Sequence, residues 1–153
     1  MRRAEGTKDV APIVCLNPRL GLWRVRLAIT PTETGAEWYE QDFDHRPTSD
    51  EIRALFVELV NEKVQQSILT GFTYEGKSVW LSEENQLNFR STPTVPVRFK
   101  LGEDEEGNAL YHTFTSAEEL TTFNKAISDH IAKCLNEGWT EKDGFDVEPY
   151  LRE

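Results

Sequence analysis

The stretch that most constrains the fold of this 153-residue chain covers residues 70–89, TGFTYEGKSVWLSEENQLNF. Gly71 is typical of the residue that follows a helix, and Glu75-Gly76 suits a tight turn between two short aromatic strands. Ser82, followed by two glutamates, is typical of a helix start. Because long amphipathic patterns lie on both sides, we expect this stretch to pack the two halves of the chain together.

Two long helices flank it. The first is predicted to begin at Thr48, which forms a capping box with Glu51. Its apolar side chains recur on one face over about five turns: Ile52, Leu55, Phe56, Leu59, Val60 and Ile68. The second begins at Thr115 or Ser116, since both registers offer a capping box, and we expect Gly138 to end it. Its apolar stripe contains Leu120, Phe123, Ile127, Ile131, Cys134 and Leu135.

Alternation of apolar and polar residues predicts strands that pair as hairpins. They are Leu22–Ile29 with Trp38–Phe43 and Val95–Leu101 with Leu110–Phe114, beside a short strand at Ile13–Leu16. The predicted fold class is therefore α+β, with two long amphipathic helices and one short helix packed on a mostly antiparallel sheet of hairpins.

The length and composition predict one domain. Residues 1–11 are small and polar, and we expect a flexible arm there. A single α+β domain then covers residues 12–153, with an N-terminal hairpin segment at 12–47 and an acidic tail at 138–153. Trp139, Phe145 and Tyr150 are candidates for holding that tail on the body of the protein.

The formal charge of −10 is unevenly spread. Residues 1–30 carry six basic and two acidic side chains, whereas residues 101–153 carry four basic and thirteen acidic ones. This balance argues against binding to nucleic acid or an anionic membrane, both of which need clustered Lys and Arg. No apolar run approaches the length of a transmembrane helix, and the N-terminus does not resemble a signal peptide, so we expect a protein of the cytoplasm.

No pattern of catalytic, metal-binding or cofactor-binding residues is present. The spacing of His45, His112 and His130 fits no zinc site, and Cys15 and Cys134 form no C-x-x-C motif. Both cysteines are expected to be buried thiols, with a disulfide between them left open. Phosphate-binding and nucleophile-elbow motifs are missing as well. We therefore predict a protein that is not an enzyme and needs no cofactor.

Three groups of residues are candidates for an interaction surface. Arg24 and Arg26 lie on the polar face of the first long strand, and four consecutive acids form the turn of the second hairpin: Glu103, Asp104, Glu105 and Glu106. Phe72, Tyr74 and Trp80 belong to the group of aromatic side chains that can stack on sugars or bases, but we expect at least two of them in the core. Tyr74 and Trp80 complete the candidate surface.

Residues 48–137 resemble a phage tail-fibre-associated domain of unknown function. The resemblance rests on a helix ending in Gly71-Phe72, the hydrophobic hairpin of residues 74–81, Asn85-Gln86, the strand over residues 97–101 and the final helix. The sequence is similar in particular to versions carried on prophages of Bacteroidetes. Family members often end a longer fibre protein, whereas here the domain follows a strand-rich segment.

The resemblance implies a tail-associated protein: a tail-fibre or baseplate accessory, or an assembly factor, acting through protein–protein contacts. It would be made in the host cytoplasm, could be incorporated in the virion tail, and would have other phage tail or fibre proteins as partners, with a homo-oligomer left open. The alternative function is a small acidic inhibitor or immunity-type protein that binds a basic protein surface.

Overall fold

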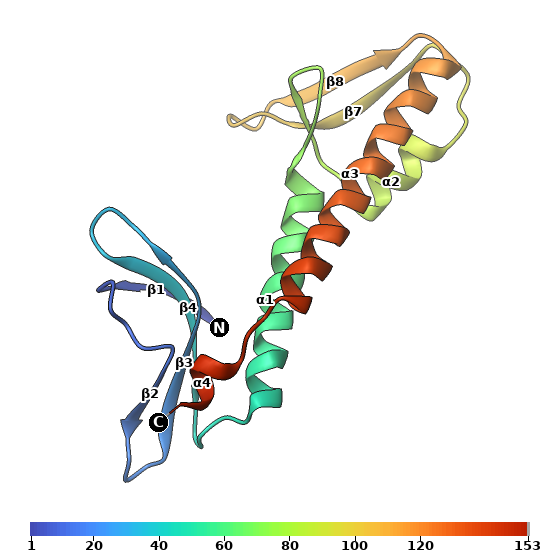
Figure 1. Cartoon of the computed structure of the whole chain (residues 1–153). Helices are drawn as coiled ribbons and strands as arrows, with labels where there is room; N and C mark the ends of the chain where they lie inside the picture. The colour runs from blue at the N-terminus through green and yellow to red at the C-terminus, as the bar shows by residue number, and fades with distance from the viewer. Residues whose placement is uncertain (153) are drawn as a thin grey trace. The chain divides into compact units, whose positions relative to one another are not determined.

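We describe a computed structural model that covers residues 1–152 of the chain (Figure 1). The α+β class is confirmed, with antiparallel strands throughout and two long helices. The chain forms two compact units, unit 1 with residues 1–59 and 144–153 and unit 2 with residues 60–143. This differs from the expected single domain, because the buried apolar residues gather in two separate clusters.

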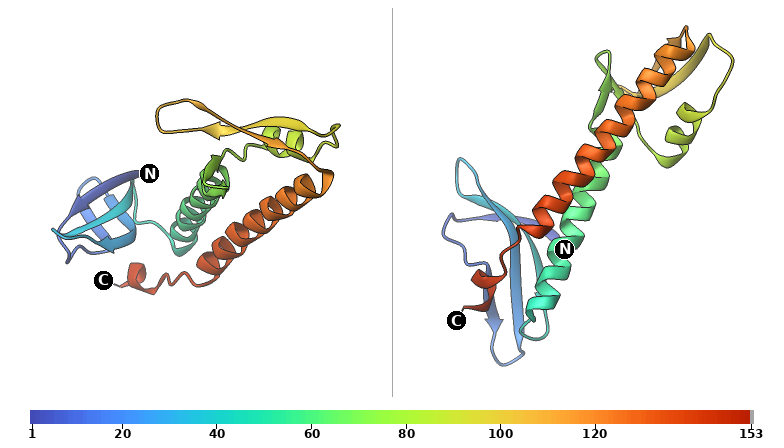
Figure 2. Two further views of the ribbon diagram at one scale, coloured as in Figure 1. Left: turned by 90° about the horizontal axis from the view of Figure 1, so that it is seen from above. Right: turned by 45° about the vertical axis from the view of Figure 1, so that its right-hand side comes forward.

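Unit 1 contains a four-stranded antiparallel sheet with the strand order β1-β4-β3-β2 (Figure 2). The strands are β1 (Arg2–Gly6), β2 (Ile13–Asn17), β3 (Leu22–Pro31) and β4 (Ala36–Phe43). The expectation of a flexible arm over residues 1–11 is thus wrong for β1. Arg2–Gly6 pairs with β4 over five residues, and the arginines of β1 form ion pairs with acids of β4.

One face of this sheet carries the core of unit 1. Val25 and Leu27 of β3 are buried there against Ile52 in the first half of α1 (Ser49–Thr70). The helix begins as predicted: Thr48 Oγ1 accepts from the Glu51 amide at 3.2 Å, and Glu51 Oε1 accepts from the Thr48 amide at 3.3 Å.

The C-terminal segment belongs to the same core. Phe145 stacks on Phe56 with ring centroids 4.2 Å apart, and Tyr150 of the short helix α4 (Glu148–Leu151) donates from its hydroxyl to Arg26 O at 2.8 Å. These two aromatic residues hold the tail in unit 1 as predicted. Trp139 does not, since it lies on α3 and is 53% exposed.

Unit 2 contains the second half of α1, two hairpins, a short helix and a long helix. The hairpins are β5 (Phe72–Tyr74) with β6 (Lys77–Val79) and β7 (Val97–Glu103) with β8 (Ala109–Phe114). The helices are α2 (Glu83–Arg90) and α3 (Ala117–Asp143). Their core combines Ile68 of α1 with buried residues of every other element. The segment 70–89 therefore joins helices and a hairpin within unit 2, rather than both halves of the chain.

Gly138 does not end α3, which continues to Asp143. A Cβ at Gly138 would lie 2.5 Å from Val64 Cγ2 of α1, closer than real contacts allow. The glycine therefore permits the close approach of α3 to the second half of α1, and these segments run side by side in the right-hand view of Figure 2. Among residues 1–152, no helix has the length and apolarity that crossing a membrane requires.

We predict that Gly138→Ala lowers the free energy of unfolding by about 1–2 kcal/mol. Overpacking costs about 1–3 kcal/mol, and the better helix propensity of alanine offsets at most about 1 kcal/mol of this cost. Urea unfolding followed by circular dichroism measures the change. Ser128→Ala, at an exposed position of the same helix, is the control and should be nearly neutral. If the clash is the cause, Gly138→Ala should cost much less in a Val64→Ala background; an equal cost there would contradict it.

A second prediction concerns Tyr150, which is 7% exposed and whose pKa burial raises to about 12. Tyr150→Phe removes the donor to Arg26 O and should cost about 1 kcal/mol of unfolding free energy. Tyr39→Phe changes an exposed phenol of the same unit and serves as the control. Equal, negligible effects of the two substitutions would show that the Tyr150 hydroxyl does not secure the tail.

Candidate functional site

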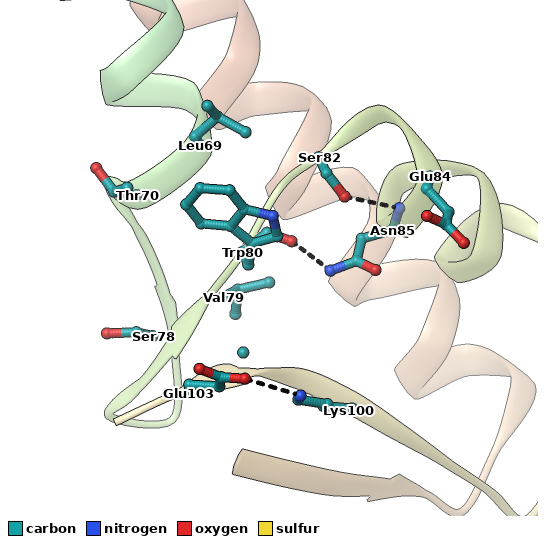
Figure 3. A pocket seen from close by; sticks show the side chains of 11 residues that line it. Leu69, Thr70, Ser78, Val79, Trp80, Ser82, Glu84, Asn85, Lys100 and Glu103 are labelled. Atoms are coloured by element: carbon teal, nitrogen blue, oxygen red, sulfur yellow. Dashed lines mark hydrogen bonds and ion pairs between the residues drawn. The ribbon is translucent and has the colours of Figure 1, made fainter. Parts of the chain in front are cut away.

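A half-open groove with a volume of about 670 Å³ lies on unit 2 (Figure 3). Four segments line it: the end of α1, β6 with the residue after it, the start of α2, and the end of β7. Figure 3 shows Trp80 between α1 and α2, with Lys100 and Glu103 on the strand across from it. Apart from Leu69, Val79, Trp80 and Gly102, all lining residues are polar or charged.

Trp80 is exposed because of the extended backbone around it. Val79 and Leu81 are each 1% exposed, so the side chain between them must point away from the core, and Trp80 is 46% exposed. Its amide donates to Leu101 O at 2.8 Å, and its carbonyl accepts from Asn85 Nδ2 at 2.8 Å. These bonds to β7 and α2 fix the position from which the indole enters the groove.

Gly102 allows β7 to pass close to β6. A Cβ at this position would lie 2.8 Å from Ser78 O and 3.3 Å from Trp80 N. On the other side of the groove, Ser82 caps α2 as predicted, because its Oγ accepts from the Asn85 amide at 3.2 Å. The close approach of β7 to β6 and the hydrogen bonds at the start of α2 thus set the positions of the backbone segments that line the groove.

The groove carries both signs of charge. Lys100 Nζ lies 3.1 Å from Glu103 Oε1, which pairs these two residues along β7. Glu84, in the first turn of α2, has no ion pair or hydrogen bond to its carboxylate among residues 1–152. Two carboxylates and one ammonium leave a negative formal charge on the lining.

Of the predicted interaction residues, Trp80 and Glu103 both line this groove. Asp104, Glu105 and Glu106 continue from Glu103 into the exposed turn between β7 and β8. Within that turn Asp104 Oδ1 accepts from two backbone amides, at 3.0 and 2.8 Å, and these hydrogen bonds lower its pKa. Asp104 therefore shapes the turn, whereas Glu105 and Glu106 are exposed and Glu106 Oε2 accepts from Asn108 Nδ2 at 3.4 Å.

Tyr74 is half-buried and packs against the core of unit 2. Its ring lies 4.8 Å from Phe123 and 5.2 Å from His112, and burial raises its pKa. Phe72 is 9% exposed in the same cluster. Two of the three aromatic residues of the hairpin segment therefore belong to the core, as expected, and Trp80 is the exposed one.

Arg24 and Arg26 of unit 1 do not form a free basic surface. Their side chains are 24% and 14% exposed, and the register of the sheet places Asp42 opposite Arg24 and Glu40 opposite Arg26. Arg24 donates to both carboxylate oxygens of Asp42, at 2.7 and 3.1 Å. The R-x-R pattern of β3 facing E-x-D in β4 was the sequence signal for this pairing.

Two histidines are paired with carboxylates that also cap helices. His45 Nε2 lies 2.7 Å from Glu51, the capping residue of α1, and His112 Nε2 lies 2.7 Å from Glu119. Glu119 in turn accepts from the Thr115 amide at 3.1 Å, at the start of α3. Hydrogen bonds from the histidines lower the pKa of both glutamates. Neither pair lies in the lining of the groove.

The third histidine lies beside a cysteine without the properties of a nucleophilic pair. His130 Nε2 is 3.0 Å from Ser67 O and 3.7 Å from Cys134 Sγ. Burial raises the pKa of the Cys134 thiol, which is the opposite of the shift that activates a cysteine. Cys134 and Cys15 are both free thiols. Within residues 1–152, no three His, Cys, Asp or Glu side chains converge as ligands for a metal ion.

No protein-family model, curated protein or solved structure matches this chain. The resemblance to the phage tail-fibre-associated domain therefore stays a prediction.

The pairing of Arg24 with Asp42 gives a prediction for acid titration. Hydrogen bonds from Arg24 lower the pKa of Asp42 from 3.8 to about 2, against the opposing effect of burial. The contribution of this ion pair to the free energy of unfolding is therefore fully present above pH 3.8. It is lost as the pH falls toward 2 and Asp42 is protonated. Carboxyl-detected NMR titration should find this low pKa, and Arg24→Gln should move it back toward 3.8. Arg19→Gln is the control; an ordinary Asp42 pKa in the native protein would refute the pairing.

Proposed function

We propose that this chain is a non-enzymatic protein that acts through protein–protein contacts, as a tail-fibre or baseplate accessory of a phage or prophage, or as an assembly factor for one. The observation that carries the contact role is the lining of the groove, where an exposed tryptophan lies among hydroxyl, amide and charged side chains. Preformed surfaces with an aromatic anchor and a polar rim are typical of protein interfaces.

The titratable groups support contact over catalysis. Acid–base catalysis needs a histidine or carboxylate that is held in place against a bound substrate. The groove lining contains no histidine, Glu103 is paired with Lys100, and no described residue holds the Glu84 carboxylate. The two histidine–carboxylate pairs instead lie where Glu51 and Glu119 cap α1 and α3. These groups therefore already have a structural role.

The phage-tail setting rests on the resemblance of residues 48–137. In this setting the partners are other tail or fibre proteins, and the protein is made in the host cytoplasm. If it is incorporated in the virion, it acts in the tail. An assembly factor would leave the tail after synthesis. Presence in purified virions separates these two roles.

A second candidate function is supported by charge. The chain carries 27 acidic and 17 basic side chains, and the acidic turn between β7 and β8 is exposed. An acidic inhibitor or immunity-type protein would use such a surface to block a basic enzyme. Its binding would depend on salt, because the Debye length shrinks to about 4 Å at about 0.5 M.

Co-expression with the tail-fibre and baseplate proteins of the same phage genome tests the proposal. We predict a complex with at least one of them that survives size-exclusion chromatography and releases no chemically altered product from either partner. The inhibitor function would be favoured by the opposite pattern: no association with any tail protein, together with inhibition of a basic nuclease that is lost at about 0.5 M salt.

A further inference from the structure

The groove on unit 2 has a fixed aromatic anchor. Hydrogen bonds to Leu101 O and from Asn85 Nδ2 hold the backbone of Trp80, and the buried side chains on both sides prevent it from rotating inward. A ligand that packs on this indole therefore meets a preformed surface, and little conformational entropy is lost on binding. Trp139 is similarly exposed but lies on α3, outside the groove.

The charges around the anchor determine which ligand fits. Glu84 lies on the α2 side of the groove with a carboxylate that no described residue engages, and Glu103 lies on the β7 side with one oxygen on Lys100. Glu105 and Glu106 extend this negative surface along the hairpin turn. Lining and turn together hold five carboxylates against one ammonium.

Two neighbouring cations, one from each hairpin, are occupied. The Arg98 guanidinium lies 4.3 Å from the centre of the Tyr111 ring, and Lys77 Nζ donates to Tyr111 O at 3.0 Å. They lie against β8, and neither belongs to the groove lining. A cation that enters the groove thus meets the indole face and the Glu84 carboxylate with only Lys100 to repel it.

We propose that this groove is the docking site for an extended basic segment of a partner protein. An arginine or lysine of the segment stacks on Trp80, because the face of an indole attracts cations. Further basic side chains pair with Glu84 and with the acidic turn. This inference rests on the proposed contact function and adds the surface and the chemistry of the partner. A phosphate backbone is excluded, since the carboxylates would repel it.

The test uses the full chain and a peptide of alternating arginine and serine, about nine residues long, which can extend along a groove and the turn beside it. A peptide with citrulline in place of arginine keeps the shape without the charge. In ¹⁵N NMR spectra we expect the arginine peptide to shift the Trp80 indole resonance, identified with Trp80→Phe, and the amides of residues 82–85 and 100–106. The citrulline peptide should leave them in place.

Matched variants separate the groove from the general acidity of the protein. Trp80→Ala and the double variant Glu84→Gln/Glu103→Gln should each weaken binding about tenfold or more, a change that titration resolves easily. Trp139→Ala removes another exposed tryptophan, and Glu118→Gln/Glu137→Gln removes two carboxylates outside the groove; both should bind as the native chain does. The altered side chains are exposed or line the groove, and circular dichroism confirms that each variant is folded.

Three results would overturn the docking site. They are an absence of shifts at the groove, equal loss of binding in the control variants, and equal binding of the citrulline peptide or a neutral glucose oligosaccharide at Trp80. The co-expression experiment tests the proposed function independently of the docking site. If no tail protein binds the native chain while the arginine peptide still occupies the groove, the docking site is supported and the role in a phage tail is refuted. If a tail complex forms and Trp80→Ala does not weaken it, the contact function is supported and this docking site is refuted.

Discussion

The arrangement of unit 2 depends on one buried ring, Phe123 of α3, which has no exposed surface. The rings of Tyr74, Phe114, Phe89 and Phe72 lie between 4.8 and 6.1 Å from it. These rings come from β5, β8 and α2, so a single side chain of α3 contacts three elements of unit 2 that are separated along the chain. Each such ring contributes roughly 1.5–3 kcal/mol by burial, and favourable ring pairs add to that.

The groove is a consequence of this core. Val79 and Leu81 belong to the same buried cluster, and an extended backbone that buries both must point the residue between them outward. Trp80 is therefore exposed by the packing of its neighbours, and the start of α2 and the end of β7 provide the walls. The proposed docking role uses a surface that the fold makes rigid, without a moving lid or a reactive group.

The helix starts could be predicted because their signals are local. Thr48 with Glu51 and Ser82 with Asn85 form their capping hydrogen bonds across three residues, and both appear in the structure as expected. The strands of the hairpins were found by alternation, which is local as well. The α+β class followed from these elements.

The features that were missed depend on partners far away in the sequence. Gly138 looked like a helix end, but Val64 makes it a packing position inside α3. Arg2–Gly6 looked like an arm until β4 supplied its pairing partner. Arg24 looked like a docking residue although Asp42 neutralises it across the hairpin. The groove needs the contact of Trp80 with Leu101, which no pattern within either segment indicates.

Amide hydrogen exchange of the full chain, alone and bound to a co-purifying tail protein, shows whether the partner occupies the groove around Trp80. The account predicts that binding slows exchange at residues 78–85 and 100–106, around the groove and the acidic turn, while the amides of the four-stranded sheet exchange as before. Slower exchange in that sheet, with unchanged amides around Trp80, would contradict the account.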